Sequence, residues 1–270
     1  MRRWLPAFLA AGICFGAGNS LSPEEARQGW ILLFDGKTMK GWLDPSKKSP
    51  PGTAWAVEDG CLTTRPGARI TEDLISEESY GDFELVFDWR VAPGGNSGVK
   101  YRIQRLFFLD DSRAVQGPGG FEGMLGREFA SPASSRARLA EGARAQEYVV
   151  AFEMQLLDDE RHPDARNGAN RLTGALYAMI APSASPARPA GEWNSGRIVL
   201  RGDSVQHWIN GVKVLDASLA SQAVKEGISQ RWRAAPAIGE LLLRPKPSGA
   251  ISLQYHGDKV WFRNLKLRRL

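Results

Sequence analysis

The sequence of 270 residues is long enough for one large domain or two small ones around a substantial hydrophobic core. Its 35 basic and 30 acidic residues give a formal net charge of +5 at pH 7, an excess too small to indicate a nucleic-acid-binding surface. Two cysteines in a chain of this length exclude a fold built on a disulfide framework.

The first 20 residues predict a signal peptide. Two arginines at positions 2 and 3 precede an apolar stretch at 4–17, which small residues follow. This stretch is shorter than the ~20 apolar residues of a membrane span, so we expect an exported, periplasmic or extracellular protein without a membrane span. Cleavage would remove Cys14 and leave Cys61 alone, as a small buried hydrophobe. It would also leave 33 of the 35 basic residues against 30 acidic ones.

The composition of the remaining chain predicts an all-β sandwich of two antiparallel sheets. Helix signals are scarce, while Trp, Phe, Val, Gly and Pro are plentiful. Residues 22–28 are typical of one helical turn, with Ser22 as its cap and Pro23 at its first position. Residues 55–62 predict a hairpin around the Asp59–Gly60 turn.

Two neighbouring strands follow, and each has one apolar and one polar face. Residues 81–91 alternate most clearly, with Phe83, Leu85, Phe87 and Trp89 on one face and Glu84, Asp88 and Arg90 on the other. Residues 99–104 alternate in the same way after a glycine-rich turn. The polar faces carry Arg90 in the first strand and Lys100 and Arg102 in the second. These cations fit an ordinary surface and a ligand-binding face equally well.

Residues 105–146 form the least regular part of the sequence. A loop of this length is often a lid or a binding loop, and we interpret 105–146 as an insertion, with a short helix at 136–144, into a single domain spanning 21–270. Residues 217–249 are also weakly patterned.

The strand signals return between and after these segments. Residues 203–216 predict a hairpin about Asn210–Gly211. His207 alternates there with Val205 and Ile209, as expected for a core histidine. A last pair of strands is predicted around a turn at 256–258.

The densest group of polar residues lies at 147–182. A strand containing Glu153 and Gln155 leads into the segment DDERHPDA, which proline and the following Asn and Gly residues mark as a loop. Most charge runs are solvated turns. His162 favours a functional interpretation, because the carboxylates around it would raise its proton affinity.

These residues allow some chemistries and disfavour others. Sandwich glucanases carry Glu-x-Asp-x-Glu along one strand for two-carboxylate hydrolysis, whereas this strand offers only Glu153 and Gln155. No Gly-x-Ser-x-Gly motif is present. Asp158, His162 and Asp164 could ligate a divalent metal ion. Asp158 with His162 also suits proton abstraction by an imidazole base.

Several segments together resemble the 3-keto-disaccharide hydrolase domain family, and they cover most of the chain after the leader in order. The resemblance implies a concanavalin A-like jelly-roll sandwich, usually exported, that acts on or binds sugars oxidised at C3. The segments are GWILLFDGKTMKGW, WAVEDGCL, YGDFELVFDWRVAPGGNSGVKYRI, FEMQLLDDERHPDA, TGALYAMIAPS, AGEWNSGRIVLRGDSVQHWINGVKVLD and YHGDKVWFRNLKLR.

The resemblance gives the missing carboxylate pair a chemical explanation. A ketone at C3 acidifies the C2 proton, so the glycosidic bond can break by elimination, with water added afterwards. We expect His162 to act as base, supported by Asp158, and Glu153 to act as acid. The predicted sugar and enolate contacts are Arg90, Asn96, Lys100, Tyr101, Gln155 and Tyr177. A divalent ion at the His162 loop could replace the cationic side chain.

Two other functions remain open at this point. One is a carbohydrate-binding module with the same sandwich and no turnover, because function resides in the site and not in the fold. The other is an ordinary glycoside hydrolase, which the single carboxylate on the central strand disfavours. A carbohydrate is the expected partner in all three cases. The sugar, the linkage and the oligomeric state do not follow from the sequence.

Overall fold

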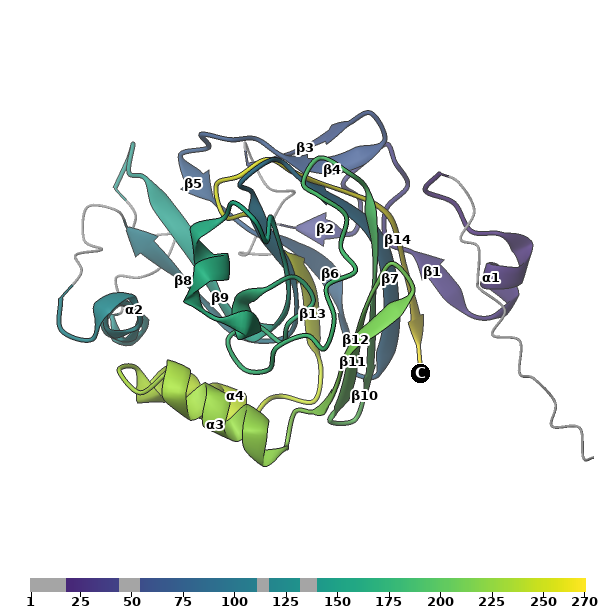
Figure 1. Cartoon of the computed structure of the whole chain (residues 1–270). Coiled ribbons are helices and arrows are strands. Elements are labelled where there is room, and N and C mark those ends of the chain that lie inside the picture. The colour runs from purple at the N-terminus through teal and green to yellow at the C-terminus, as the bar shows by residue number, and fades with distance from the viewer. Residues whose placement is uncertain (1–17, 44–53, 111–116, 132–139) are drawn as a thin grey trace, which may run out of the picture.

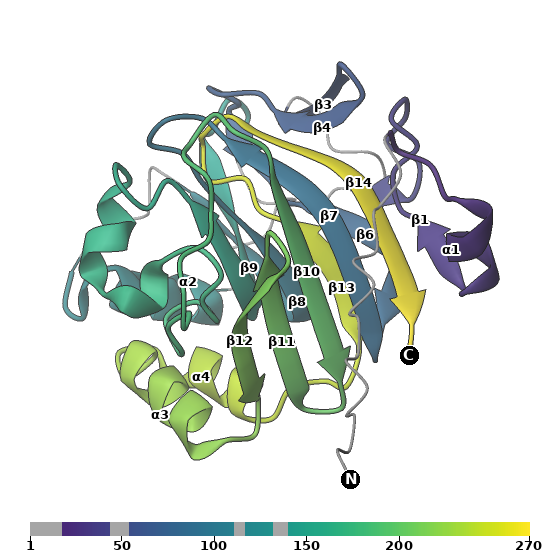
Figure 2. The same ribbon diagram turned by 45° about the vertical axis from the view of Figure 1, so that its right-hand side comes forward.

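The computed structural model describes residues 18–43, 54–110, 117–131 and 140–270. Within these residues two β-sheets pack face to face, with helices on both sides of the sandwich (Figure 1). Figure 2 shows the larger sheet in front of the smaller one. The predicted all-β sandwich is confirmed.

The larger sheet, sheet A, follows the order β12-β11-β10-β7-β14-β4-β3, with β1 also paired to β14. Its strands are β1 (Trp30–Leu32), β3 (Trp55–Glu58), β4 (Cys61–Thr64), β7 (Phe83–Val91), β10 (Asn194–Arg201), β11 (Ser204–Ile209), β12 (Val212–Ser218) and β14 (Val260–Arg269).

The smaller sheet, sheet B, follows the order β2-β6-β13-β8-β9-β5. All its pairings are antiparallel except the short parallel contact of β5 with β9. Its strands are β2 (Trp42–Leu43), β5 (Ile70–Thr71), β6 (Leu74–Tyr80), β8 (Asn96–Asp110), β9 (Ala145–Leu157) and β13 (Gly249–Leu253).

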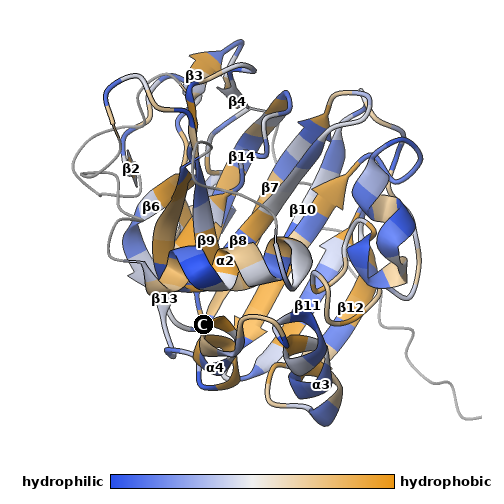
Figure 3. Ribbon diagram, turned by 90° about the vertical axis from the view of Figure 1, so that its left-hand side faces the viewer, coloured by the Kyte–Doolittle hydropathy of each residue, from blue (hydrophilic) through white to orange (hydrophobic). Residues whose placement is uncertain are grey.

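Alternation along the strands builds the core between the sheets. Phe83 and Leu85 of β7 meet Tyr101 of β8 and Phe152 of β9 in one buried cluster. Figure 3 shows the resulting bands of hydrophobic and hydrophilic residues along the strands. Because side chains alternate between the two faces of a strand, the polar neighbours of these core residues lie on the outer faces of the sandwich.

The local turn predictions are confirmed. Asp59–Gly60 joins β3 to β4, and Asn210–Gly211 joins β11 to β12; all four residues have positive φ, as a tight hairpin turn requires. Helix α1 (Pro23–Arg27) is capped by Ser22, as its sequence indicates. Cys61 is buried and free.

The segment 105–146, predicted as an insertion, belongs at both ends to strands of sheet B. Strand β8 continues to Asp110 and β9 begins at Ala145. Phe107 and Leu109 lie in the core, which is why the strand persists there. Helix α2 (Gly120–Ala130) lies between β8 and β9 in the chain. The helix predicted at 136–144 falls mostly outside the described residues, and its described end, 140–144, is a turn and irregular chain.

The weakly patterned segment 217–249 contains two helices that the sequence did not reveal. They are α3 (Gln222–Arg231) and α4 (Pro236–Leu243), which pack against each other. Each helix is short and buries only a few apolar residues. The sequence therefore shows no clear helical repeat of apolar positions there. Two 3-10 helices, η2 (Pro163–Asn167) and η3 (Ala169–Arg171), follow β9.

Most of the predicted signal peptide, residues 1–17, lies outside the described residues. In the part of the chain that the structure describes, no helix is long and apolar enough to cross a membrane.

His207 is a core residue, as its alternation predicts. Its Nδ1 lies 2.9 Å from the carbonyl oxygen of Gly174, and its Nε2 lies 3.0 Å from the hydroxyl of Tyr101. A carbonyl only accepts, so Nδ1 carries the proton and Nε2 accepts from Tyr101. The ring is therefore neutral and joins the two sheets. Burial lowers the pKa of His207 from 6.5 to about 4.

This burial predicts a loss of stability in mild acid. The fold stabilises the neutral ring, so the contribution of His207 is complete above pH 6.5 and is lost as the pH falls through about 4. At about 1.4 kcal/mol per pKa unit, the loss is on the order of 3 kcal/mol. Urea unfolding should show a steeper fall for the wild type than for His207→Gln across this range. Parallel curves for the two proteins would contradict the assignment.

Candidate active site

A pocket opens on the face of sheet B that points away from the core. Along β8, Val99 and Tyr101 point into the core and Lys100 points to the pocket. Along β9, Phe152 points to the core, while Glu153 points to the pocket. The pocket thus follows directly from strand alternation on two adjacent strands.

A buried ion pair lies at the centre of this face. The Lys100 ammonium is 2.8 Å from a carboxylate oxygen of Asp73, and both side chains are almost fully buried. Asp73 also accepts hydrogen bonds from the Ser252 hydroxyl at 2.8 Å and from the Tyr255 amide at 3.1 Å. Three donors on its two oxygens hold the Asp73 side chain in place.

Glu153 lies opposite Lys100 in the register of β8 and β9. Its side chain is 8% exposed. Burial raises its pKa from 4.5 to about 7, although the positive charges of Lys100 and Arg231 oppose this rise. A carboxyl group that titrates near neutral pH can both take and give a proton, which is the requirement for general acid–base chemistry.

Two neighbours fix the position of Glu153. Gly98 lies beneath it, and a Cβ atom added there would lie 2.7 Å from the Glu153 Cδ, so glycine makes room for the carboxyl group. With its amide oriented to satisfy both neighbours, Gln155 donates to the Ser97 carbonyl at 3.1 Å and to the Glu153 Oε1 at 3.2 Å.

A second cation of the pocket, Arg231, comes from a helix and not from sheet B. Arg231, at the end of α3, donates to the Tyr148 hydroxyl at 3.0 Å. Its guanidinium also lies 4.5 Å from the ring centre of Tyr177. Within the described residues no carboxylate forms an ion pair with Arg231, although its charge acts on Glu153. The pocket therefore holds a cation without a fixed counter-ion.

Several buried polar atoms around the pocket have no hydrogen-bond partner in the described part of the chain. They are Asn96 Oδ1, Glu147 Oε1, Arg231 Nε and Gln254 Oε1, all on residues that line the pocket. Buried polar groups are nearly always paired in folded proteins, with protein atoms or with ordered water, so this cluster marks the pocket as a place where water or a polar ligand binds.

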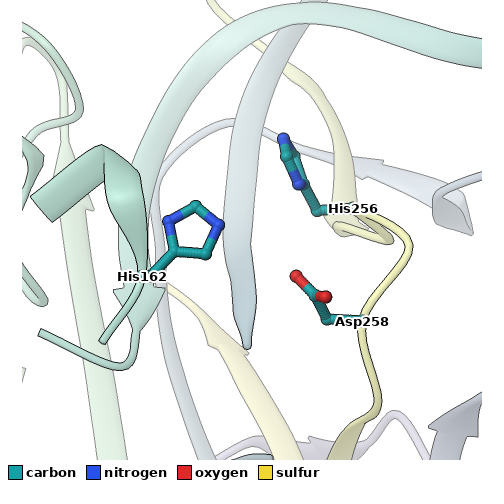
Figure 4. A group of neighbouring side chains, drawn as sticks. All are labelled: His162, His256 and Asp258. Atoms are coloured by element: carbon teal, nitrogen blue, oxygen red, sulfur yellow. The ribbon is translucent and has the colours of Figure 1, made fainter. Parts of the chain in front are cut away.

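Two histidines and a carboxylate gather beside the pocket. Ligand atoms of His162, His256 and Asp258 lie within 4.8 Å of one another (Figure 4). This is a possible divalent-metal set. The Nδ1 of His162 accepts the amide hydrogen of Asp164 at 3.1 Å, so the neutral ring carries its proton on Nε2, the nitrogen a metal would need. Holding a cation through Nε2 would require the contact with Asp164 to be given up.

The structure brings five of the predicted site residues together. Asn96, Lys100, Glu153, Gln155 and Tyr177 all line the pocket. His162 is not among the lining residues, but its ring lies 5.9 Å from that of His256, which is.

Two predicted sugar contacts lie elsewhere. Arg90 belongs to sheet A, where its guanidinium stacks on Trp261 at 4.2 Å and on Trp193 at 4.9 Å, on the opposite side of the sandwich. Tyr101 is fully buried and its hydroxyl contacts His207. The sequence correctly assigns a polar face to both strands, but it does not show that they belong to different sheets.

Asp158 does not orient the His162 ring as predicted. Its carboxylate accepts hydrogen bonds from the Gly94 amide and from Arg161. Burial would raise the pKa of Asp158, but these hydrogen bonds outweigh it and lower the pKa. Only the backbone carbonyl of Asp158 contacts His162. Asp158 therefore holds the turn after β9 in shape.

Other pocket residues were missed by the sequence analysis. Glu147 shares its face of β9 with Glu153, so strand alternation could have identified it. Asp73, Arg231 and His256 come from segments far apart in the sequence, and only the fold brings them together.

Comparisons with known proteins identify the family. The family model described as the 3-keto-alpha-glucoside-1,2-lyase-like domain matches residues 29–268. A Bacteroides thetaiotaomicron protein named 3-keto-disaccharide hydrolase is 32% identical over 269 aligned positions, covering 93% of this chain and 82% of that protein.

Two solved structures are also similar to this chain. The crystal structure of a candidate glycosyl hydrolase from Parabacteroides distasonis has a TM-score of 0.68 and 28% identity, and the match covers 93% of this chain and 99% of that one. A second such structure from this organism, at 21% identity and a TM-score of 0.56, covers 89% of this chain and 99% of its own. It shares the fold.

The environment of Glu153 predicts an unusual titration. Carbon-13 NMR of the glutamate carboxyl groups should show Glu153 titrating near pH 7, where its pKa of about 7 places it. Arg231→Met should raise this pKa further, because it removes a cation that stabilises the charged form. Arg90→Met, on the other sheet, is the matched control and should change nothing. A Glu153 that titrates like an exposed glutamate would refute this description of the pocket.

Proposed function

Because the chain belongs to the 3-keto-alpha-glucoside-1,2-lyase-like family, we propose that it cleaves the glycosidic bond of 3-keto-glycosides by C2 proton abstraction, elimination and hydration. The observation that supports this most directly is Glu153, a buried carboxyl group with a pKa of about 7 between the cations Lys100 and Arg231. That combination provides a base together with positive charge for an enolate.

The first step assigns the base to Glu153, in place of His162. The carboxylate takes the C2 proton, and the electrons of the C2–H bond form a C2–C3 double bond while negative charge moves to the ketone oxygen. A base whose pKa lies near neutral pH is present in its ionised form and still binds the proton well enough to remove it. Glu153 meets this condition inside the pocket.

The two cations then stabilise the enolate. Lys100 donates to Asp73 through one of its three hydrogens, so two remain for a ligand. Arg231 has an unpaired Nε, and its printed hydrogen bond within the described residues goes to the Tyr148 hydroxyl. In a buried pocket such fixed charges act more strongly than they would in water.

Collapse of the enolate completes the elimination. The ketone reforms, a C1–C2 double bond forms, and the C1–oxygen bond breaks with its electrons going to the leaving oxygen. The protonated Glu153 supplies the proton that this oxygen needs. Water then adds its hydroxyl to C1 and a hydrogen to C2, so the net reaction is hydrolysis. His256, at the pocket with His162 beside it, is placed to take a proton from the incoming water.

The proposal includes export. The charged and apolar pattern of residues 1–20 supports a signal peptide, and hence action in the periplasm or outside the cell.

A comparison of substrates tests the function. The wild type should release monosaccharide from a 3-keto-disaccharide and leave the unoxidised parent intact, because only the ketone acidifies C2. In deuterated water, deuterium should also appear at C2 of the product. Cleavage of both sugars would favour an ordinary glycosidase, and saturable binding without products would favour a carbohydrate-binding module. Either result would overturn the proposal.

Substitutions separate the two assignments of the base. Glu153→Gln keeps the shape and removes the titrating group, so turnover and C2 exchange should fall by ~100- to 10,000-fold. His162→Ala should lose less, because His162 lies outside the pocket lining. Both variants should keep the wild-type melting temperature within a few degrees. A larger loss in His162→Ala than in Glu153→Gln would return the role of base to the histidine.

A further inference from the structure

Asn19, at the end of the proposed signal peptide, is tied into sheet A by three hydrogen bonds. Its amide donates to the Asn264 Oδ1 at 2.7 Å, and its own Oδ1 accepts from the Asn264 amide at 2.8 Å. Its Nδ2 donates to the Gly60 carbonyl at 2.8 Å. Asn19 thus joins β14 to the turn between β3 and β4.

Asn264, the main partner of Asn19, lies at an irregular point of β14. A β-bulge shifts the register of β14 against β7 around this residue, which has a φ of 54°. Its amide is outside the regular ladder and donates to Asn19 instead, while its Nδ2 donates to Asp88 at 2.6 Å. Loss of Asn19 would deprive the Asn264 amide and the Gly60 carbonyl of their partners, which destabilises the fold.

The packing around Asn19 is also close. A Cβ atom added to Gly36, which has a φ of +78°, would lie 2.5 Å from the Asn19 Nδ2, so the glycine makes room for this side chain. Gly18, the preceding residue, is exposed, and a Cβ atom added there would meet no atom within 4 Å. Among the described residues, the close contacts of the chain therefore begin at Asn19.

The sequence at 14–20 allows more than one cleavage site. Two small residues separated by one position mark the end of a signal peptide, and this pattern occurs as Cys14-x-Gly16, Gly16-x-Gly18 and Gly18-x-Ser20. Cleavage after Ser20 would remove Asn19 with its three hydrogen bonds. Cleavage after Gly18 keeps Asn19 and turns its nitrogen into an ammonium group, which is a stronger donor to the same acceptor.

We propose that the Gly18–Asn19 peptide bond is the processing site, so that the mature protein begins at Asn19. A signal peptidase hydrolyses this bond: the carbon–nitrogen bond breaks, the hydroxyl of water goes to the Gly18 carbonyl carbon, and its hydrogen goes to the Asn19 nitrogen. The new terminus stays bound to Asn264 and holds β14 to the β3–β4 turn. This inference rests on the export that the proposed function includes, and it ends the signal peptide at residue 18 instead of 20.

Maturation of the full-length chain tests the site. The precursor is expressed in a bacterium, the exported protein is purified, and mass spectrometry gives its intact mass and its N-terminal peptide. The mature chain should begin at Asn19. A chain that begins at Ala17 or at Leu21 would overturn the assignment while leaving export intact. If all of the protein keeps residues 1–18 and stays in the cytoplasm, the export part of the proposed function fails, which is a different result.

Two matched variants separate the sites that the sequence allows. Gly16→Leu removes a small residue from the Gly16-x-Gly18 pattern and leaves Gly18-x-Ser20 intact, so the precursor should accumulate. Ser20→Leu changes only the second pattern, at an exposed position, and should mature like the wild type. The reverse outcome, with Ser20→Leu blocked and Gly16→Leu processed, would place the cleavage after Ser20.

A stability measurement tests why Asn19 is retained. Asn19→Ala removes the two hydrogen bonds of the side chain and keeps the backbone one, so the exported variant should melt about 4 °C below the wild type. Ser20→Ala, at the exposed next position, is the control and should melt with the wild type. An unchanged melting temperature in Asn19→Ala would refute the structural role from which the processing site is inferred.

Discussion

The buried ion pair between Asp73 and Lys100 is the contact on which the candidate site depends. Asp73 collects hydrogen bonds from Lys100 of β8 and Ser252 of β13, so it connects the middle strands of sheet B. The desolvation of two buried charges offsets much of their attraction, so such a pair is weak evidence for stability. Its effect on the site is electrostatic: it fixes a cation opposite Glu153.

Two glutamates on one strand therefore acquire different chemistry. Glu153 is balanced by Lys100 and Arg231, which offset part of the effect of burial and leave its pKa near neutral. For Glu147, burial and the neighbouring Asp73 carboxylate outweigh the charge of Lys100, so its pKa is raised well above the usual value. Environments that push two similar groups apart in pKa are a general way of dividing proton transfer from hydrogen-bond donation within one site.

The sequence predicted features that depend on neighbouring positions in the chain better than features that depend on distant segments. Alternation along β8 and β9 correctly placed Lys100, Glu153 and Gln155 on a polar face, because side-chain direction within a strand depends only on sequence position. Alternation was also right about Arg90 and Tyr101, but their assignment as sugar contacts did not follow from it. Arg90 is on a polar face of the other sheet, and Tyr101, read as a sugar contact, belongs to the core face of its own strand.

The sequence by itself determined the all-β class, the hairpin turns at Asp59–Gly60 and Asn210–Gly211, and the two faces of each long strand, since these follow from backbone preferences and period-two patterning. The tertiary structure alone decided which polar faces meet. It brought Asp73, Arg231 and His256 to Glu153 from segments distant in the sequence, and it gave the carboxyl groups their pKa values. The physical reason is that desolvation and charge–charge interaction depend on distance in space, and no local pattern in the chain encodes that distance.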